Sequence, residues 1–552
     1  MRLAFILLFI AVGSTGITAQ DMVPDTTLML DDVTIYSSRI RKFAAGQRME
    51  TLDSATRVVF PSATLAELIP GFTSSYVRNY GQGSLATLSF RGTSANHTAL
   101  LWNGIRLAPP NIGYLDISLV QGGFFPDISV LHGGASSMFG SGSVGASVLL
   151  ENRPVFLKNS YDLDLGISAG SFGMLSAQGS GTVSTNKVFS RTVFSFTRSK
   201  NDFTYNDLNG KEEKMAHSEY LRSGFLQDLA LRLPGNQYLM ASAWFQYAER
   251  NIPATLTEDS ATAEQMDRSW RTMLIWKDFN PKNTLEAKLA YFNEFTRYAD
   301  PTPSIYSTIA TQSMAGSFES SWDAWKNGAF FAGVQFFYDY ADLDYYGRPQ
   351  DQENLAVYVS FRHSFPSIGW QVSLNGRQEF FTGFNSPFLF SAGTEGKIWR
   401  AFSGNFSVSR NFRAPTLNER FWVPGGNPDL KPEESWNAEA GILYDKKFNF
   451  STTKAGLTFF QSWVDNWILW LPVTSSLWAV ENAQEVWSRG MEVFCNQAVE
   501  FGRVDLDISG SYTLSRSTNE EKLFDQDASY RKQLIYTPVH RFIIQSGAGY
   551  RG

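Results

Sequence analysis

From about residue 159 to residue 552, apolar and polar side chains alternate with a period of two. Clear examples are the segments 161–169, 330–340, 370–375 and 504–512. Because successive side chains of a β-strand point to opposite faces, this pattern predicts strands with one apolar face each. Two further segments, 187–206 and 450–472, are longer than the ordinary strand of roughly five or six residues. The chain is therefore predicted to be mainly β, with long strands.

Link lengths and aromatic positions favour a membrane barrel over a soluble sandwich. Short turns are predicted at 234–236, 280–283, 326–328 and 366–369, and longer polar links at 200–217, 250–267, 298–311, 341–353, 421–433 and 515–536. Aromatic residues near segment ends suggest membrane girdles: Trp244, Phe245, Tyr247, Tyr345, Tyr346, Trp467 and Trp470. We expect an antiparallel transmembrane β-barrel of about eighteen strands over 159–552, apolar outside and polar inside, at roughly twenty-two residues per strand with its link.

The N-terminal segment 1–19 has the features of a secretory signal peptide. Arg2 supplies a positive charge, and Leu3 to Val12 form an apolar run too short to span a bilayer as a helix. Cleavage is expected at Ala19–Gln20. The rest of the chain has no apolar run of about eighteen residues, so no transmembrane helix is expected. An exported chain that spans a membrane then has to be a closed barrel, which satisfies every backbone polar group in lipid.

Residues 40–153 follow a different pattern, with short apolar strands separated by many glycine-containing turns. The segment Ser62 to Ile69 is predicted to form a short helix, with Ser62 or Thr64 as its N-cap and Pro70 just after its end. A mixed α/β domain of this size, ahead of a large barrel, is expected to be a plug that fills the lumen.

Composition excludes several classes of function. Among 552 residues, 18% are charged and 15% aromatic, and the net charge of -6 argues against a nucleic-acid binder. A single cysteine, Cys495, and five histidines leave no disulfide scaffold or thiolate metal site. Gly140-x-Gly142-x-x-Gly145 matches a dinucleotide fingerprint in letters only, because a β-prone run follows it and no helix opens there. No enzyme constellation is found.

An ordered series of motifs resembles those of TonB-dependent outer-membrane receptors. In the plug region these are Leu65 to Gly71, Leu88 to Gly92, Leu100 to Leu107 and Asp127 to Leu149, and in the barrel Ser409 to Glu419, Gly426 to Glu433 and Tyr536 to His540. The sequence departs from the family pattern at Asn103, at His132-Gly133-Gly134 and at Ala146. The resemblance implies twenty-two strands, as in other plugged outer-membrane transporters. We therefore expect that the chain lacks its last few strands, or that its barrel is smaller.

The resemblance also implies a coupling segment in the N-terminal stretch 20–39. Its β-prone residues resemble a TonB box: Leu30, Asp31, Asp32, Val33, Thr34, Ile35 and Tyr36. Such a segment pairs its backbone with the edge of a partner sheet. The expected partners are TonB with its inner-membrane energising complex and the outer-membrane bilayer, and a surface lipoprotein is a further candidate. The alternative is that residues 30–36 form the first strand of the plug.

The ligand is expected to bind where the apices of the plug meet the extracellular loops. The candidate residues are Arg78, Asn79, Tyr80 and Gln82 in one turn, and Pro110, Asn111, Gly113 and Tyr114 in the next. Aromatic and amide groups suit a large, partly polar ligand. Within the family, Arg91 to Thr98 and Leu100 to Leu107 are most similar to vitamin B12 receptors, so cobalamin is the expected ligand and a ferric siderophore the alternative. Ordinary turn roles remain open for each residue.

Charged residues suggest two further features. The plug residues Arg57, Arg91, Arg106 and Arg153 are expected either to pair with the lumen carboxylates Glu433, Glu434 or Glu439, or to remain solvated. Asp202 and Asp207, in a long polar link, would suit calcium through hard oxygen ligands, although a solvated loop is the simpler interpretation. Two rival functions are a passive porin and an outer-membrane enzyme; the plug and the coupling segment argue against the porin.

Overall fold

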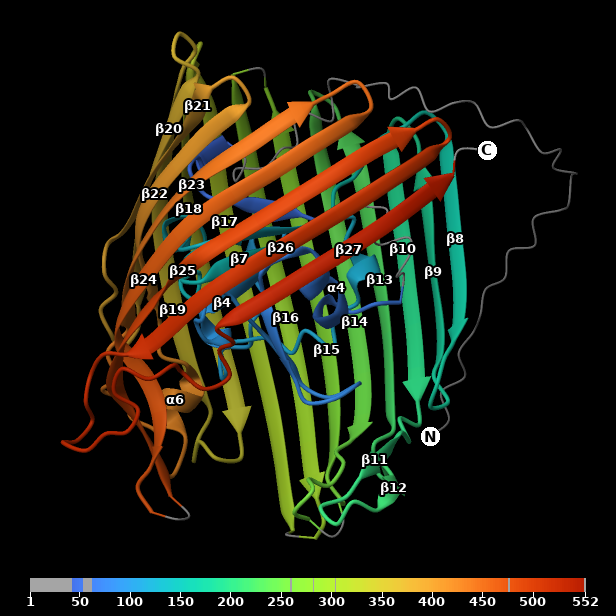
Figure 1. The fold of residues 1–552 in the computed structure, drawn as a ribbon, viewed down its shortest axis with the longest axis vertical. Helices are drawn as coiled ribbons and strands as arrows, with labels where there is room; N and C mark the ends of the chain where they lie inside the picture. The colour runs from blue at the N-terminus through green and yellow to red at the C-terminus, as the bar shows by residue number, and fades with distance from the viewer. Residues whose placement is uncertain are drawn as a thin grey trace, which may run out of the picture. The chain divides into compact units, whose positions relative to one another are not determined.

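The computed structural model describes residues 42–52, 62–258, 261–280, 282–302, 304–474 and 477–550. Residues from Phe43 onward form one compact unit, in which a small mixed domain lies inside a barrel-shaped sheet (Figure 1). The predicted signal peptide and the segment 20–39 lie outside the described residues. Within the described ranges, no helix is both long enough and apolar enough to cross a membrane.

In the described part of the chain, eighteen strands form the barrel, and each is antiparallel to the strand that follows it along the sheet from β8 to β27. They are β8 (Ser160–Ala169), β9 (Leu175–Ser184), β10 (Val188–Ser199), β13 (Tyr220–Leu233), β14 (Gln237–Asn251), β15 (Glu264–Phe279), β16 (Asn283–Asp300), β17 (Ile305–Trp325), β18 (Gly328–Leu343), β19 (Gln350–Phe365), β20 (Trp370–Phe381), β21 (Leu389–Trp399), β22 (Phe402–Arg413), β23 (Glu433–Lys447), β24 (Ser451–Pro472), β25 (Trp478–Phe501), β26 (Val504–Asn519) and β27 (His540–Tyr550). The predicted number and type of strands are confirmed.

The sheet closes on itself between β27 and β8, which are neighbours in the order of the barrel. Leu163 and Ile167 of β8 are 71% and 81% exposed, and Ile544 of β27 is 81% exposed. Large apolar side chains are therefore exposed on both strands of this seam.

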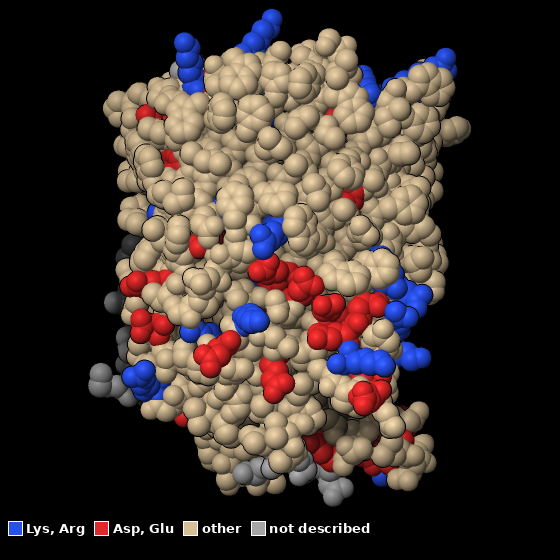
Figure 2. Space-filling model, turned by 90° about the vertical axis from the view of Figure 1, so that its left-hand side faces the viewer, with Lys and Arg blue, Asp and Glu red and all other residues tan. Residues whose placement is uncertain are grey.

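The faces of the strands follow the predicted alternation. In β18, Phe330, Val334 and Phe336 are exposed on the outer face, whereas Gln335 and Asp339 are buried on the inner face. Figure 2 shows a second division, along the height of the outer surface: uncharged side chains cover most of the upper half of one side, and charged side chains gather in the lower half. The lower end also carries the long links, which contain α6 (Leu417–Phe421), β11 (Thr204–Asn206) and β12 (Glu212–Lys214) (Figure 1).

The predicted short turns are confirmed, but two of the predicted long links and one of the predicted long strands are wrong. The link 298–311 shrinks to 301–304, because β16 runs to Asp300 and β17 begins at Ile305. The link 341–353 shrinks to 344–349, because β18 runs to Leu343 and β19 begins at Gln350. The segment 187–206 is not one strand, because β10 ends at Ser199. Asn201 then adopts a positive φ of 54°, which takes the chain out of the extended conformation.

The plug contains a five-stranded sheet in the order β1-β6-β7-β4-β5, with β4 and β7 parallel. Its strands are β1 (Met49–Thr51), β4 (Thr98–Trp102), β5 (Ile105–Arg106), β6 (Asp127–His132) and β7 (Ala146–Glu151). A separate hairpin joins β2 (Tyr76–Asn79) to β3 (Ala86–Ser89), and the helical turns are α4 (Leu65–Phe72), α5 (Ser136–Phe139), η1 (Ala95–His97) and η2 (Gly122–Phe124). Val130, Val148 and Leu150 are fully buried at its centre.

Helix α4 begins as predicted but ends later. The backbone N–H of Thr64 donates to the Glu67 carboxylate at 2.7 Å, as expected for a capped first turn. Pro70 lies inside the helix and not after it. A proline there removes one backbone donor, and the helix still closes two residues later because Thr73 donates its N–H and its hydroxyl to the Ile69 carbonyl, at 3.1 and 2.9 Å.

Three aromatic residues predicted to lie in membrane girdles are instead buried. Trp244 and Trp467 face inward from β14 and β24 and are 0% and 6% exposed, whereas Tyr346 lies in the link after β18, packs against Leu417 of α6 and is 3% exposed. The Trp244 ring meets Trp102 of the plug edge-on, with 5.5 Å between ring centroids. Position along the strand alone did not reveal this, because the parity of the residue decides which face it occupies.

We expect Trp244→Ala to destabilise the protein by about 3–5 kcal/mol, because it opens a cavity between barrel and plug. The measurement is calorimetric unfolding of the detergent-solubilised chain. Phe330→Ala, on the outer face, is the matched control and is expected to cost less. Equal losses from the two variants would contradict the inward packing of Trp244.

Candidate functional site

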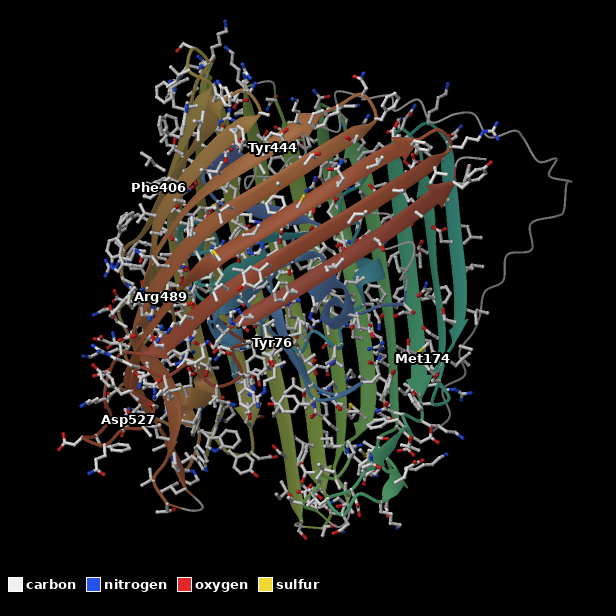
Figure 3. The ribbon with its side chains drawn as sticks, in the orientation of Figure 1. Tyr76, Met174, Phe406, Tyr444, Arg489 and Asp527 are labelled. Atoms are coloured by element: carbon white, nitrogen blue, oxygen red, sulfur yellow. The ribbon has the colours of Figure 1, made fainter. Side chains whose placement is uncertain are left out.

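The first plug apex presents Arg78 between two tyrosine rings. Its guanidinium carbon lies 4.7 Å from the ring centroid of Tyr80 and 3.6 Å from that of Tyr536. Tyr80 follows β2 and is 55% exposed, whereas Tyr536 belongs to the link between β26 and β27. Figure 3 labels Tyr76 at the start of β2 and Asp527 in the same long link. An arginine stacked on aromatic faces connects this apex to a barrel loop.

The rest of the first apex is held by polar contacts. The Asn79 Oδ1 accepts the backbone N–H of Gly81 at 3.0 Å, which shapes the turn. The Gln82 Nε2 donates to Glu67 at 3.0 Å, and the Gln82 carbonyl accepts from the Asn201 side chain at 3.1 Å. Both Asn79 and Gln82 remain exposed. Polar groups are therefore displayed on a loop whose backbone is fixed.

The second apex is docked against the barrel. The carbonyls of Pro110 and Asn111 accept the backbone N–H groups of Leu417 and Asn418, at 3.1 and 3.0 Å, at the start of α6. Pro110 and Asn111 are buried, and the Asn111 Oδ1 has no hydrogen-bond partner among the described residues. Gly113 has a φ of +76°, and a Cβ there would lie 2.7 Å from the Thr416 side chain. This apex is therefore in contact with α6 and leaves little exposed surface for a ligand.

Tyr114 lies where the two apices interact. Burial raises the pKa of Tyr114, and the nearby Asp116 carboxylate and Tyr80 raise it further, while Arg78 acts in the opposite direction. Tyr114 therefore feels the charge of Arg78 from the first apex. The structure brings Arg78, Tyr80 and Tyr114 together, and leaves Pro110 and Asn111 beneath α6.

Arg91 is the centre of a buried ion cluster between plug and barrel. Its guanidinium contacts Glu439 of β23 at 2.6 Å and Glu492 of β25 at 3.0 Å. Burial by itself would lower the pKa of Arg91, but the two carboxylates outweigh that effect and raise it. Glu492 also accepts from Arg48 at 3.1 Å and from the Ser74 hydroxyl at 2.7 Å. The predicted pairing of Arg91 with Glu439 is confirmed.

The other predicted plug arginines do not reach the predicted glutamates. Arg106 pairs with Asp339 of β18 at 2.7 Å. Arg153 pairs with Glu151, the last residue of β7 and two positions before it along the chain. Glu434 pairs with Arg410 of the barrel at 2.6 Å. Arg57 lies outside the described residues.

Glu433 instead joins a second buried cluster, which no feature of the sequence predicted. His97 of η1 is fully buried and its Nε2 bonds to the Glu433 carboxylate. Arg413 holds the same carboxylate at 2.7 Å and reaches Glu419 of α6 at 2.9 Å. The histidine ring also lies 4.5 Å from the ring of Trp467. A lone histidine in a turn carries no spacing signal, so only the fold reveals this contact.

The long link proposed to bind calcium uses its carboxylates locally. Asp207 Oδ1 accepts the backbone N–H groups of Asn209 and Lys211, at 2.9 and 2.8 Å. Asp202 lies 3.4 Å from the ammonium group of Lys214. In the described part of the chain, no group of three His, Cys, Asp or Glu side chains is placed to hold a metal ion. The arrangement suits a turn.

Both parts of this architecture match known families. Residues 150–552 match the family described as "TonB dependent receptor-like, beta-barrel", and residues 41–147 match the "TonB-dependent Receptor Plug Domain". The chain belongs to the TonB-dependent receptor family. A relative in sequence is the "Vitamin B12 transporter BtuB" of Vibrio vulnificus, 20% identical over 490 residues, which are 86% of this chain and 76% of the relative. The protein of the same name from Photobacterium profundum is 20% identical over 83% and 74% of the two chains.

Solved structures of this receptor family share the fold. The FrpB iron transporter of Neisseria meningitidis superposes with a TM-score of 0.72 at 13% identity, over 89% of this chain and 83% of that one. The ferric enterobactin receptor PfeA of Pseudomonas aeruginosa gives a TM-score of 0.70 at 13% identity, over 91% and 90%. At such low identity these similarities establish the architecture alone.

We expect Arg91→Gln to weaken the seating of the plug, because it leaves Glu439 and Glu492 buried with less compensation. Breaking a buried ion pair costs about 3–5 kcal/mol. The measurement is the urea concentration at which the protein in a planar bilayer begins to conduct ions, which should fall. Arg106→Gln, at a pair whose arginine is 23% exposed, is the control and should shift it less. A conductance threshold unchanged by Arg91→Gln would contradict the role of the cluster.

Proposed function

We propose that this receptor is an outer-membrane transporter that takes up a scarce, large ligand with energy supplied through TonB. The observation that carries the proposal is the occupied lumen, in which plug and barrel are joined by the buried clusters around Arg91 and His97. A large ligand can pass only if the plug moves. Polar contacts are suited to that movement, because separated charges can be rehydrated whereas separated apolar surfaces are not.

The coupling step is assigned to Leu30–Tyr36. This segment lies outside the described residues, and its assignment rests on the resemblance of its sequence to a TonB box. An extended segment adds to the edge of a partner sheet mainly through backbone hydrogen bonds, so its departures from the usual letters are tolerable. Force applied at this end of the plug would be carried to the ion cluster of Arg48 and Arg91.

Cobalamin is the ligand that we favour. The curated relatives named above are vitamin B12 transporters and align over most of both chains. At the first apex, the rings of Tyr80 and Tyr536 lie against Arg78 and suit a large ligand with a planar face. A ferric siderophore is the second candidate, favoured by the cationic Arg78 at the same apex. The contact residues that we propose are Arg78, Asn79, Tyr80, Gln82 and Tyr114, with Pro110, Asn111 and Gly113 holding the second apex in place.

The first experiment is a binding titration of the purified protein with cyanocobalamin and with a panel of ferric siderophores. We expect saturable cobalamin binding that weakens about tenfold in Tyr80→Ala, because a stacked aromatic contact is lost. Tyr205→Ala, in the β11–β12 hairpin, is the matched control. Siderophore binding without cobalamin binding would retain the transport mechanism and replace the ligand.

Deletion of residues 30–36 is expected to abolish energy-dependent uptake while leaving ligand binding intact, because coupling and recognition lie in different parts of the chain. The measurement is accumulation of labelled ligand in cells with and without a proton-gradient uncoupler. The second variant replaces residues 30–36 by a glycine-serine segment. A deletion of equal length within the link 421–433 is unsuitable as a control, because that link carries contacts of α6. Uptake that persists in both variants would refute the coupling role.

A further inference from the structure

A row of tryptophans crosses the outer face of the barrel. Trp436 of β23 is paired with Trp463 of β24, which is paired with Trp487 of β25. The rings of Trp463 and Trp487 have centroids 5.5 Å apart. Tryptophans on the outer face gather at the level of the lipid head groups, where an apolar ring and a polar N–H are both accommodated. The row marks that level on this side of the barrel.

Two arginines oppose each other one step from this row. Arg489 of β25 and Arg516 of β26 are direct partners in the strand register, so both side chains project from the same outer face. The guanidinium carbon of Arg489 lies 3.7 Å above the Trp487 ring. Like charges placed directly opposite each other destabilise a sheet. The pair therefore needs a counter-charge from its surroundings.

The chain supplies little of that counter-charge. Arg489 donates to the Trp487 carbonyl and the Thr518 hydroxyl, and its nearest carboxylate, Glu520, is 3.9 Å away. Glu520 is shared with Arg531 at 3.7 Å. Among the residues that the structure describes, no carboxylate lies within ion-pair distance of Arg516. Arg410, another outward arginine beside the same tryptophan row, differs in having Glu434 at 2.6 Å.

The arginine pair lies at the boundary between an apolar part and an acidic part of the outer wall. Figure 3 shows Arg489 at the left side of the barrel wall, where β25 approaches the end that carries the long links. Towards the opposite end, outward residues of β24 and β25 are apolar: Phe459 is 56% exposed and Val493 is 38% exposed. Towards the long links, the outward residues are the acidic Asp465 and Glu485. Such a boundary is where lipid phosphates lie against a membrane protein.

We propose that Arg489 and Arg516 form a binding site on the outer wall for a lipid whose head group carries a phosphate monoester. A phosphate monoester has a charge of about -1.5 to -2 and three acceptor oxygens, which match two guanidinium groups, whereas a phosphodiester carries about half that charge. A guanidinium group can donate two parallel hydrogen bonds to phosphate oxygens, and stacking on the Trp487 ring holds Arg489 in position to do so. The acyl chains of the lipid would lie along the apolar wall beside Phe459 and Val493. The site is independent of the transported ligand.

The test is native mass spectrometry of the intact detergent-solubilised protein, titrated with diphosphorylated lipid A. Comparators are the same lipid after enzymatic removal of its phosphates, and phosphatidylglycerol. The Arg489→Gln/Arg516→Gln double variant is expected to lower the affinity for diphosphorylated lipid A at least about tenfold. Arg410→Gln, which removes an outward arginine already paired with Glu434, should leave it unchanged.

Three outcomes would overturn the site. They are equal losses in the double variant and in Arg410→Gln, equally tight binding of the dephosphorylated lipid, and equally tight binding of phosphatidylglycerol. An Arg489→Lys/Arg516→Lys variant guards against a folding defect, because it keeps both charges on the outer wall and should retain part of the affinity. Cyanocobalamin binding, measured in parallel, should be the same in all variants, which separates this site from the proposed transport function.

Discussion

Buried charge is the constraint on which the rest of this structure depends. Arg91 is removed from water at the centre of the molecule, and a buried guanidinium is tolerated only where carboxylates surround it. Glu439 and Glu492 meet that requirement, and they come from β23 and β25 of the barrel. The plug can therefore be seated in one orientation, with its ion pairs satisfied. A contact made of ion pairs also separates more readily than an apolar one, since water can solvate each charged partner.

The two-residue period of the strands decides which side chains of the barrel can meet this requirement. One parity of each strand faces the plug, where Trp244 packs against Trp102 and Asp339 holds Arg106. The other parity faces outward, where Trp487 and Arg489 lie. Tryptophan and arginine thus serve in both environments. Inside, they are enclosed by partners from the plug, whereas outside they meet whatever surrounds the barrel.

The two plug apices differ in their contacts. The first displays Arg78 and Tyr80, and the second is fastened by its backbone to α6. The charge of Arg78 in the first apex acts on the pKa of Tyr114 in the second, in the direction opposite to that of burial. Helix α6 is connected in turn to His97 through Glu419, Arg413 and Glu433. A chain of contacts therefore runs from the loop end of the barrel to the interior of the plug.

The sequence by itself determined the fold class, the approximate number of strands, and the division into plug and barrel. These follow from periodicity, turn residues and ordered motifs, which are local properties of the chain. For Arg91 it offered three possible glutamate partners or none, and the fold selected Glu439. Only the tertiary structure decided which aromatic residues face inward, that Pro110 and Asn111 lie under α6, and that His97 meets Glu433, because each depends on partners hundreds of residues away. It also decided that Arg489 and Arg516 stand opposite each other, since strand register is set by the pairing of whole strands and not by either residue alone.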